Sequence, residues 1–110
     1  MDKDYKLSAD QIEELVPDMG GCFATDRILV DGEPVGYMYR EEPGFPEDSG
    51  WRFVAGDETD DYMNDATNLG IYAVNTVANY DRSIIPFLIA PTGSAYARDA
   101  DSGRWAEVRD

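Results

Sequence analysis

Residues 50–58 of the chain read Gly-Trp-Arg-Phe-Val-Ala-Gly-Asp-Glu, and this stretch predicts a strand with two distinct faces. Successive side chains of a strand point to opposite sides of a sheet. Trp51 and Phe53 therefore share one face, and the arginine between them points to the other. Gly56 is expected to end the strand, and the two acids after it begin an acidic run.

The aromatic residues of this region have two interpretations. A tryptophan that alternates with phenylalanine in a short strand is typical of a core, so we expect Trp51 to be largely buried. Tryptophan and tyrosine also dominate the hot spots of protein interfaces, so Trp51 could instead be a binding anchor. The same two interpretations stay open for Tyr37 and Tyr39.

Capping and turn signals predict the elements before this strand. Ser8 and Gln11 have the spacing of a capping box, and the helix that they begin should end near Pro17. Asp31-Gly32 between two apolar runs is a strong hairpin signal. The predicted elements of this half are a helix over residues 8–17, a short strand over 22–24, and a hairpin of strands over 28–30 and 35–41.

The second half of the chain predicts a mixture of short strands and helices. Residues 71–80 alternate as a strand would, yet Asn75 is a good helix-capping residue. We expect a strand to about Val74 and a helix from Asn75. The other predicted elements are a loop over 42–49, a short helix and loop within 59–68, a short helix from 81 or 82 to 88, and a hairpin over 95–99 and 104–108. The sum is an α+β fold: a single small domain over residues 1–110, with an antiparallel β-sheet and a few short helices.

The charge of the chain restricts its partners. It has 9 Lys and Arg against 23 Asp and Glu, a formal net charge of −14. Such a surface repels nucleic-acid phosphates and anionic lipids, so we expect neither nucleic acid nor membrane as a partner. The charge serves either solubility alone or association with a basic protein.

The cysteine content and the N-terminal sequence indicate a location. Cys22 is the only cysteine of the 110 residues, so no disulfide can form within the chain. The first residues are charged and do not resemble a signal peptide. No apolar stretch approaches the roughly 20 residues needed to cross a bilayer. We therefore expect a cytoplasmic protein.

The absence of histidine from the sequence excludes most catalytic sites. It removes serine–histidine and cysteine–histidine nucleophile systems and the ordinary zinc sites. No phosphate-binding glycine pattern is present. We therefore expect no enzyme and no cofactor. The carboxylates that remain have three interpretations: a metal or acid/base site, a solvated face, or a partner-binding surface.

Acidic residues are concentrated in the middle of the chain. Residues 41–65 contain nine acids and one base, Arg52, so less than a quarter of the chain carries −8 of the −14 charges. Clustering of this kind costs stability through self-repulsion, which favours a functional reason for it. The nine acids are Glu41, Glu42, Glu47, Asp48, Asp57, Glu58, Asp60, Asp61 and Asp65.

Several blocks of the sequence resemble, in order, those of a bacterial domain family that is grouped with the immunity proteins of polymorphic toxin systems. Gly-Trp-Arg-Phe-Val-Ala-Gly-Asp-Glu is the signature block, and the likeness covers about residues 20–98. One departure is Arg82, where the family pattern has proline. The other blocks are Gly20-Gly21-Cys22, residues 35–43, Asn75 to Asp81, Ile84 to Leu88 and Gly93 to Tyr96. The resemblance implies a non-enzymatic protein that binds and neutralises a toxin domain.

Together these observations give a leading hypothesis and two alternatives. The leading hypothesis is a cytoplasmic immunity-type protein that binds a cationic toxin domain, for example a nuclease, through its acidic surface. The first alternative is a small-ligand-binding or enzymatic domain with a carboxylate site at Asp57 and Glu58, in a pocket shared with Trp51 and the Asn75, Asn79 and Asp81 group. The second is a housekeeping protein-interaction module. The residues predicted to bind a partner are Tyr39, Glu41, Glu42, Trp51, Asp57, Glu58, Asp60 and Asp61.

Overall fold

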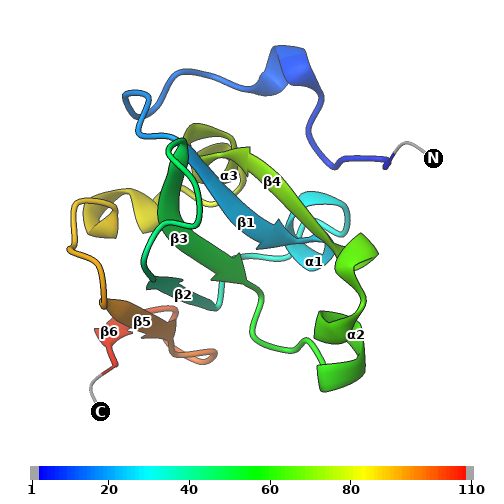
Figure 1. Ribbon diagram of the computed structural model, residues 1–110. Coiled ribbons are helices and arrows are strands. Elements are labelled where there is room, and N and C mark those ends of the chain that lie inside the picture. The colour runs from blue at the N-terminus through cyan, green and yellow to red at the C-terminus, as the bar shows by residue number, and fades with distance from the viewer. Residues whose placement is uncertain (1–2, 109–110) are drawn as a thin grey trace.

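The computed structural model describes residues 3–108, which form one six-stranded sheet with short helices (Figure 1). The strand order is β4-β1-β3-β2-β5-β6, and all pairs are antiparallel except β1 with β3. The predicted α+β class is confirmed, with a mostly antiparallel sheet. The strands are β1 (Gly21–Thr25), β2 (Tyr37–Arg40), β3 (Asp48–Val54), β4 (Leu69–Ala73), β5 (Ala95–Arg98) and β6 (Trp105–Glu107). The helices are η1 (Ala9–Gln11), α1 (Asp26–Leu29), α2 (Asp60–Asn64), η2 (Ala66–Asn68), α3 (Val74–Tyr80) and η3 (Arg82–Phe87), where η marks a 3₁₀ helix.

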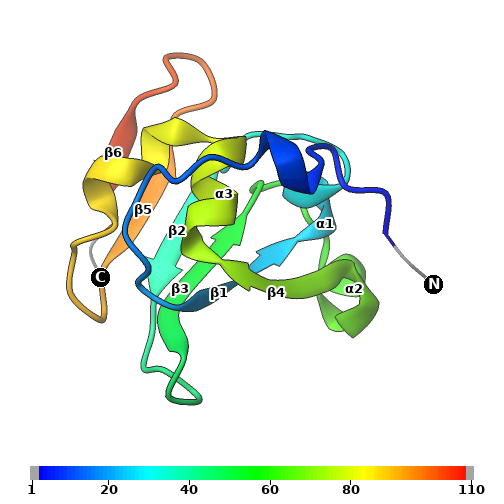
Figure 2. The same cartoon turned by 90° about the horizontal axis from the view of Figure 1, so that it is seen from above.

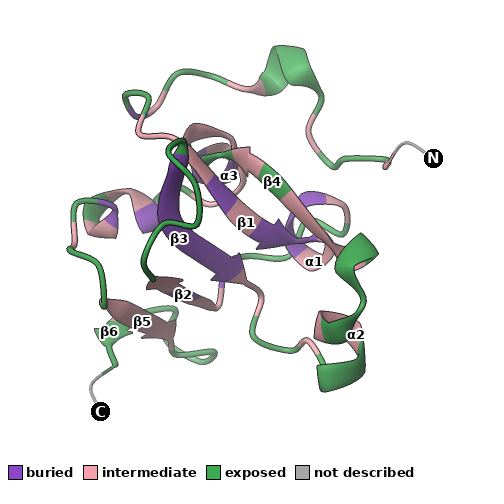
Figure 3. Cartoon of the chain, viewed as in Figure 1, coloured by how far each residue is buried: buried purple, intermediate pink, exposed green. Residues whose placement is uncertain are grey.

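Helix α3 covers one face of the sheet, whereas α2 borders the opposite face, where Met63 and Phe23 line the same hollow. Helix α3 and the N-terminal segment lie on one side, and the loop over residues 41–47 projects from the other (Figure 2). The core lies on the helical side, and β3 is buried along almost its whole length (Figure 3). Trp51 and Phe53 have no exposed surface, and their rings stack with centroids 6.0 Å apart. The core interpretation of Trp51 is therefore confirmed.

The predicted helix over residues 8–17 is wrong: only the single turn η1 forms. The Ser8 amide donates to Gln11 Oε1 over 2.8 Å, so the predicted capping contact is made. After this turn the chain is extended, because two asparagine side chains of α3 bind its backbone. The Leu15 amide donates to Asn75 Oδ1 over 2.7 Å, and Asn79 Nδ2 donates to the Glu13 carbonyl over 2.8 Å. These tertiary contacts replace the hydrogen bonds that a longer helix would have made.

The predicted hairpin over residues 28–30 and 35–41 is also wrong. The first run forms α1, with Ile28 and Leu29 buried, and Gly32 follows it with φ +79°. The Gly32 amide donates to the Ile28 carbonyl over 3.1 Å, which closes the end of the helix. A left-handed glycine ends a helix as readily as it forms a hairpin turn, so the Asp-Gly signal has two structural outcomes. Strand β2 pairs instead with β3 and β5.

The other predicted elements are confirmed in type, with two differences: β3 begins at Asp48, inside the predicted loop over 42–49, and the predicted loop after α2 contains the 3₁₀ helix η2. The strand and helix over residues 69–80 change at Ala73 and Val74, close to the predicted Asn75. Helices α2 and η2 fill the polar run, η3 follows α3, and β5 and β6 form the final hairpin. No helix within residues 3–108 has both the length and the apolar character to span a bilayer.

Candidate partner-binding surface

The signature block contains a bulge that shapes the start of β3. Gly21 of β1 pairs with Asp48 of β3, and Phe23 pairs with Arg52. Two residues further along β1 therefore correspond to four residues further along β3. Gly50 lies in the bulge with φ +91°, and a Cβ there would stand 2.3 Å from the Glu41 carbonyl oxygen. Only glycine fits this backbone and this close approach. The bulge brings the Asp48 carboxylate to the Arg52 guanidinium.

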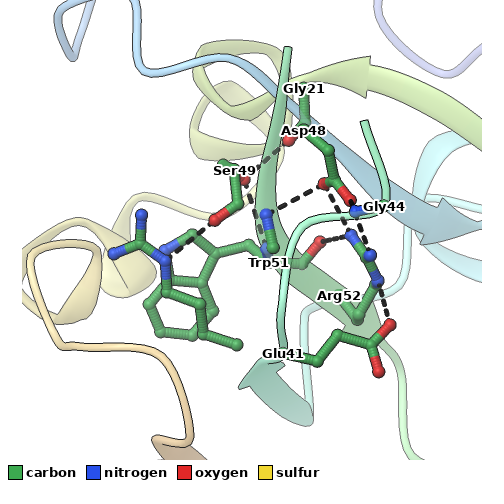
Figure 4. Close-up of polar contacts among 9 residues, drawn as sticks. Gly21, Glu41, Gly44, Asp48, Ser49, Trp51 and Arg52 are labelled. Atoms are coloured by element: carbon green, nitrogen blue, oxygen red, sulfur yellow. Dashed lines mark hydrogen bonds and ion pairs between the residues drawn. The ribbon is translucent and has the colours of Figure 1, made fainter. Parts of the chain in front are cut away.

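All three nitrogens of the Arg52 guanidinium donate hydrogen bonds on the face opposite the core (Figure 4). Its two terminal nitrogens donate to the two Asp48 oxygens, each over 2.8 Å, and Nε donates to Glu41 Oε2 over 2.7 Å. The guanidinium also lies over the Phe23 ring, 4.4 Å from its centroid. The Asp48 side chain has no exposed surface. The hydrogen bonds from Arg52 hold the pKa of Asp48 well below its usual range, against the opposing effect of burial.

Trp51 is fixed on the opposite face of the same strand. Its Nε1 donates to the Leu88 carbonyl over 3.2 Å, and the Arg40 guanidinium lies 5.7 Å from its ring. Arg40 in turn donates to the carbonyls of Ser49 and Ala90. The signature block therefore has a structural role: its side chains fix β3 to neighbouring segments on both faces of the sheet. Trp51 has no surface to offer a partner.

The face of the sheet opposite the core carries apolar and aromatic side chains. Residues paired directly across strands project to the same side, and Phe23 pairs with both Ile71 and Arg52. Ile71 is 58% exposed, and the rings of Tyr37 and Tyr39 are 5.7 Å apart. We call this surface the open sheet face; it is formed by Phe23, Tyr37, Tyr39, Val54, Leu69 and Ile71, with Met63 of α2 beside it.

Five of the nine acids in residues 41–65 have a structural partner. Besides Asp48 and Glu41, Asp65 caps η2. Glu58 accepts hydrogen bonds from Thr25 Oγ1 over 2.6 Å and from the amides of residues 55 and 56, each over 2.8 Å. Asp57 is paired with Arg27 over 2.5 Å, and hydrogen bonding to Arg27 lowers its pKa. These contacts fasten the loop after β3 to β1 and α1.

Four acids make no side-chain hydrogen bond or ion pair with any of residues 3–108. Glu42 and Glu47 lie on the loop before β3, and Asp60 and Asp61 lie in the first turn of α2. All four are exposed, and the two pairs stand at opposite ends of β3 (Figure 1). Of the predicted partner-binding residues, Glu42, Asp60 and Asp61 are therefore exposed and unpaired, whereas Tyr39 and Glu41 lie beside Arg52 on the open sheet face.

The sequence matches the profile of the Immunity protein Imm33 domain over residues 22–109. The chain belongs to this immunity-protein family. The predicted grouping with immunity proteins is confirmed, and membership indicates a role in toxin immunity with a protein as partner. Comparisons with curated proteins and with solved structures give no match.

The Imm33 domain does not form the ligand pocket predicted by the alternative hypothesis. Asn75 and Asn79 bind the N-terminal segment on the helical side, and Asp81 binds Arg98 over 2.7 Å. Asp57 and Glu58 lie beyond the far end of β3, bound to α1 and β1. Asp57 lines a hollow with Arg98, the partner of Asp81, but Trp51, Asn75 and Asn79 do not line it. Among the residues that the structure describes, no three cysteine or acidic side chains are grouped so that they could hold a metal ion.

Sequence reasoning missed several residues of the Imm33 surface. Phe23 and Met63 were not singled out, although Phe23 alternates with the buried Cys22 and Ala24 and so must point away from the core. The structural use of Glu58 was also missed. Its position two residues after Gly56 allows its carboxylate to bind backbone amides, which a sequence pattern alone does not distinguish from a solvated acid.

Proposed function

We propose that this chain is a non-enzymatic cytoplasmic immunity protein that neutralises a toxin domain by binding it. The open sheet face and the four unpaired acids would form the interface. Family membership supports the immunity role, and the arrangement of the surface supports this location for the interface.

The observation that carries the proposal is an apolar, aromatic patch flanked by unpaired charges. Protein interfaces typically have a centre depleted of charge and enriched in aromatic residues, with a polar rim around it. Tyr37, Tyr39 and Phe23 would supply the centre. Asp60 and Asp61 at one end of β3, with Glu42 and Glu47 at the other, would supply the rim.

The charge of the chain favours a cationic toxin domain. A net charge of −14 steers a basic partner towards the surface and raises the association rate. Since toxins that act on nucleic acids carry basic surfaces for their substrates, a nuclease-like domain fits this charge. Binding would then cover the basic active site with an acidic protein.

Neutralisation by binding alone is consistent with the chemistry of the chain. The sequence has no histidine. Asp57 and Glu58 of the signature block, and Asp48 just before it, are held by arginines or by backbone amides. A carboxylate fixed in this way is poorly placed to exchange protons with a substrate.

The test is co-expression, in a bacterial host, of this chain with the toxin domain encoded by a neighbouring gene. We expect the host to survive only when the chain is present, and the two proteins to co-purify as a stable complex with the toxin chemically unchanged. Survival without a complex, or with a modified toxin, would contradict neutralisation by binding. Failure to protect the host would contradict the immunity role for that toxin.

A further inference from the structure

We propose that the open sheet face contains a receptor for one basic side chain of the toxin, a lysine or an arginine. The receptor is a hollow lined by Phe23, Tyr39, Glu41, Arg52, Phe53, Val54, Met63 and Leu69. This inference rests on the proposed function and adds to it the chemistry of the group that the partner inserts.

The size of the hollow fits a side chain. Its volume is about 210 Å³. Pockets for drug-sized ligands have volumes of about 300–1,000 Å³, so this hollow is too small for a cofactor or a metabolite of that size. Phe23 and Tyr39 line it, so it lies within the aromatic centre of the proposed interface, and hot spots cluster near the centre of an interface.

Two acceptor atoms in the hollow have no hydrogen-bond partner among the described residues. Glu41 uses Oε2 for Arg52, and its side chain is 53% exposed. Neither Glu41 Oε1 nor the Tyr39 hydroxyl makes a hydrogen bond with any residue that the structure describes. The ion pair with Arg52 holds the Glu41 carboxylate in place, so less side-chain entropy is lost when a donor binds.

The arginine already in the hollow does not oppose a second cation. The bidentate pair with Asp48 balances the charge of Arg52, and the low pKa of Asp48 keeps that carboxylate ionised. With Glu41 added, the three groups carry a net charge of −1. Asp60 and Asp61 on the nearby α2 add to the negative potential. An incoming cation therefore meets an attractive field.

The walls of the hollow suit the long apolar stem of a basic side chain. Val54, Leu69 and Met63 offer aliphatic surface, and lysine and arginine bury their methylene stems while the charged head stays at a polar group. The Tyr39 ring lies beside Glu41 and would add a cation–π contact. An acidic side chain would be repelled by Glu41, and a short polar one would not reach it.

The direct test uses a small probe and NMR. Nα-acetyl-arginine methylamide is titrated into the ¹⁵N-labelled chain, in parallel with the citrulline analogue, which has the same shape but no charge. We expect shift changes centred on Phe23, Glu41 and Met63, with the arginine probe at least about fivefold tighter than the citrulline one, as for a site governed by a charge pair. Equal binding of the two probes, changes spread evenly over all exposed acids, or no change at the hollow would overturn the inference.

Two variants and a matched control sharpen the test. Glu41→Gln should abolish the preference for arginine, whereas Glu14→Gln, the same change at an exposed acid outside the open sheet face, should preserve it. Because Glu41→Gln also loosens Arg52, Met63→Lys provides a second route: it places a competing cation at the hollow and leaves the Arg52 ion pairs intact. Preference for arginine that survives both variants would contradict the receptor.

The same variants separate this inference from the proposed function. If wild-type chain binds the toxin and Glu41→Gln weakens binding about tenfold or more while Glu14→Gln changes it little, the hollow is a hot spot. If toxin binding survives both Glu41→Gln and Met63→Lys, the receptor is wrong but the immunity role stands. If wild-type chain does not bind the toxin at all, the proposed function fails independently of the probe result.

Discussion

Asp48 and Arg52 lie four positions apart on one strand, yet their side chains form a bidentate ion pair with both contacts at 2.8 Å. In a regular strand the two Cα atoms would be about 13 Å apart. The bulge at Gly50 shortens this separation, and Gly44 and Gly50 donate their amides to the same carboxylate, each over 2.9 Å. The signature block thus encodes a backbone shape and the ion pair that depends on it.

The Asp48 carboxylate should stabilise the fold in a pH-dependent way. The pKa of Asp48 is lower in the folded protein than in the unfolded chain, where it is about 4. The ionised carboxylate therefore stabilises the fold at pH values above about 4, and this stabilisation is lost as the pH falls towards the pKa of the folded state. Asp48→Ala should cost about 3 kcal/mol at pH 7, because Arg52 is left buried without its main partner. Denaturant melts between pH 7 and pH 2.5 should show a smaller fall in the free energy of unfolding for the variant than for wild type. Asp101→Asn is the control, because Asp101 is exposed and its side chain makes no hydrogen bond or ion pair with any of residues 3–108. Equal pH dependence of the Asp48 variant and wild type would contradict the prediction.

Truncation of the central tryptophan should be severe. Trp51→Ala removes a side chain with no exposed surface and its hydrogen bond to Leu88, so we expect a loss of about 3–5 kcal/mol in the free energy of unfolding. Trp51→Phe should lose less, since it keeps the contact with Phe53. Thermal and chemical melts measure both. A loss under about 1 kcal/mol for the alanine variant would place Trp51 outside the core.

Alanine substitutions at two glycines should distinguish the cost of backbone strain from the cost of a steric clash. Gly50 and Gly103 both have positive φ, so alanine at either position should cost about 1–2 kcal/mol from conformation alone. At Gly50 the new Cβ also meets the Glu41 carbonyl oxygen at 2.3 Å, whereas at Gly103 nothing lies within 4 Å. Gly50→Ala should therefore destabilise the protein clearly more than Gly103→Ala in the same melt. Similar losses would show that the bulge tolerates a side chain.

The core and the central strand could be predicted because alternation and residue type determine them locally. Trp51 and Phe53 indicate a buried face wherever their strand is placed. The change from strand to helix was predicted at Asn75 as a cap, and it occurs close by at Val74, although the Asn75 side chain binds the N-terminal segment and does not cap the helix. The hairpin predicted from Asp31-Gly32 is wrong because a left-handed glycine occurs both in hairpin turns and at the ends of helices. Which of the two forms depends on tertiary packing, here on the burial of Ile28 in α1.

The candidate surface was predicted only in part, because an acid looks the same in sequence whether it is paired or not. Glu58 and Asp57 seemed equivalent to Asp60 and Asp61, yet the first two are bound to the loop and to Arg27. Asp57 and Glu58 have partners that lie 30 and 33 residues away in the sequence, Arg27 and Thr25 respectively. No local pattern records such pairs.

The asparagines of α3 should hold the N-terminal segment. Asn75 accepts from the amides of Leu15 and Val16 and donates to the Glu13 carbonyl, so Asn75→Ala should cost about 2 kcal/mol for three lost hydrogen bonds. Amide hydrogen exchange at Leu15 and Val16 should accelerate in this variant and stay unchanged in Asn64→Ala, which alters an exposed asparagine. Unchanged exchange in Asn75→Ala would mean that the segment is held by other contacts.

The unpaired acids should control how fast the toxin associates. The triple variant Glu42→Gln/Asp60→Asn/Asp61→Asn removes charge from the rim of the open sheet face without breaking a contact in the structure, so the fold should be retained. Glu58 is left in place because its carboxylate binds the loop after β3. We expect association with the toxin to slow about tenfold at low salt, and the wild-type rate to fall towards that of the variant as salt is added.

The matched control is Asp4→Asn/Glu14→Gln/Asp101→Asn, which removes the same charge from three exposed acids outside the proposed surface. If the control slows association as much as the rim variant, the net charge of the chain steers the partner and the position of the acids is irrelevant. If neither variant changes the rate and salt has no effect, these acids are a solvated face, and the interface must be sought elsewhere on the domain.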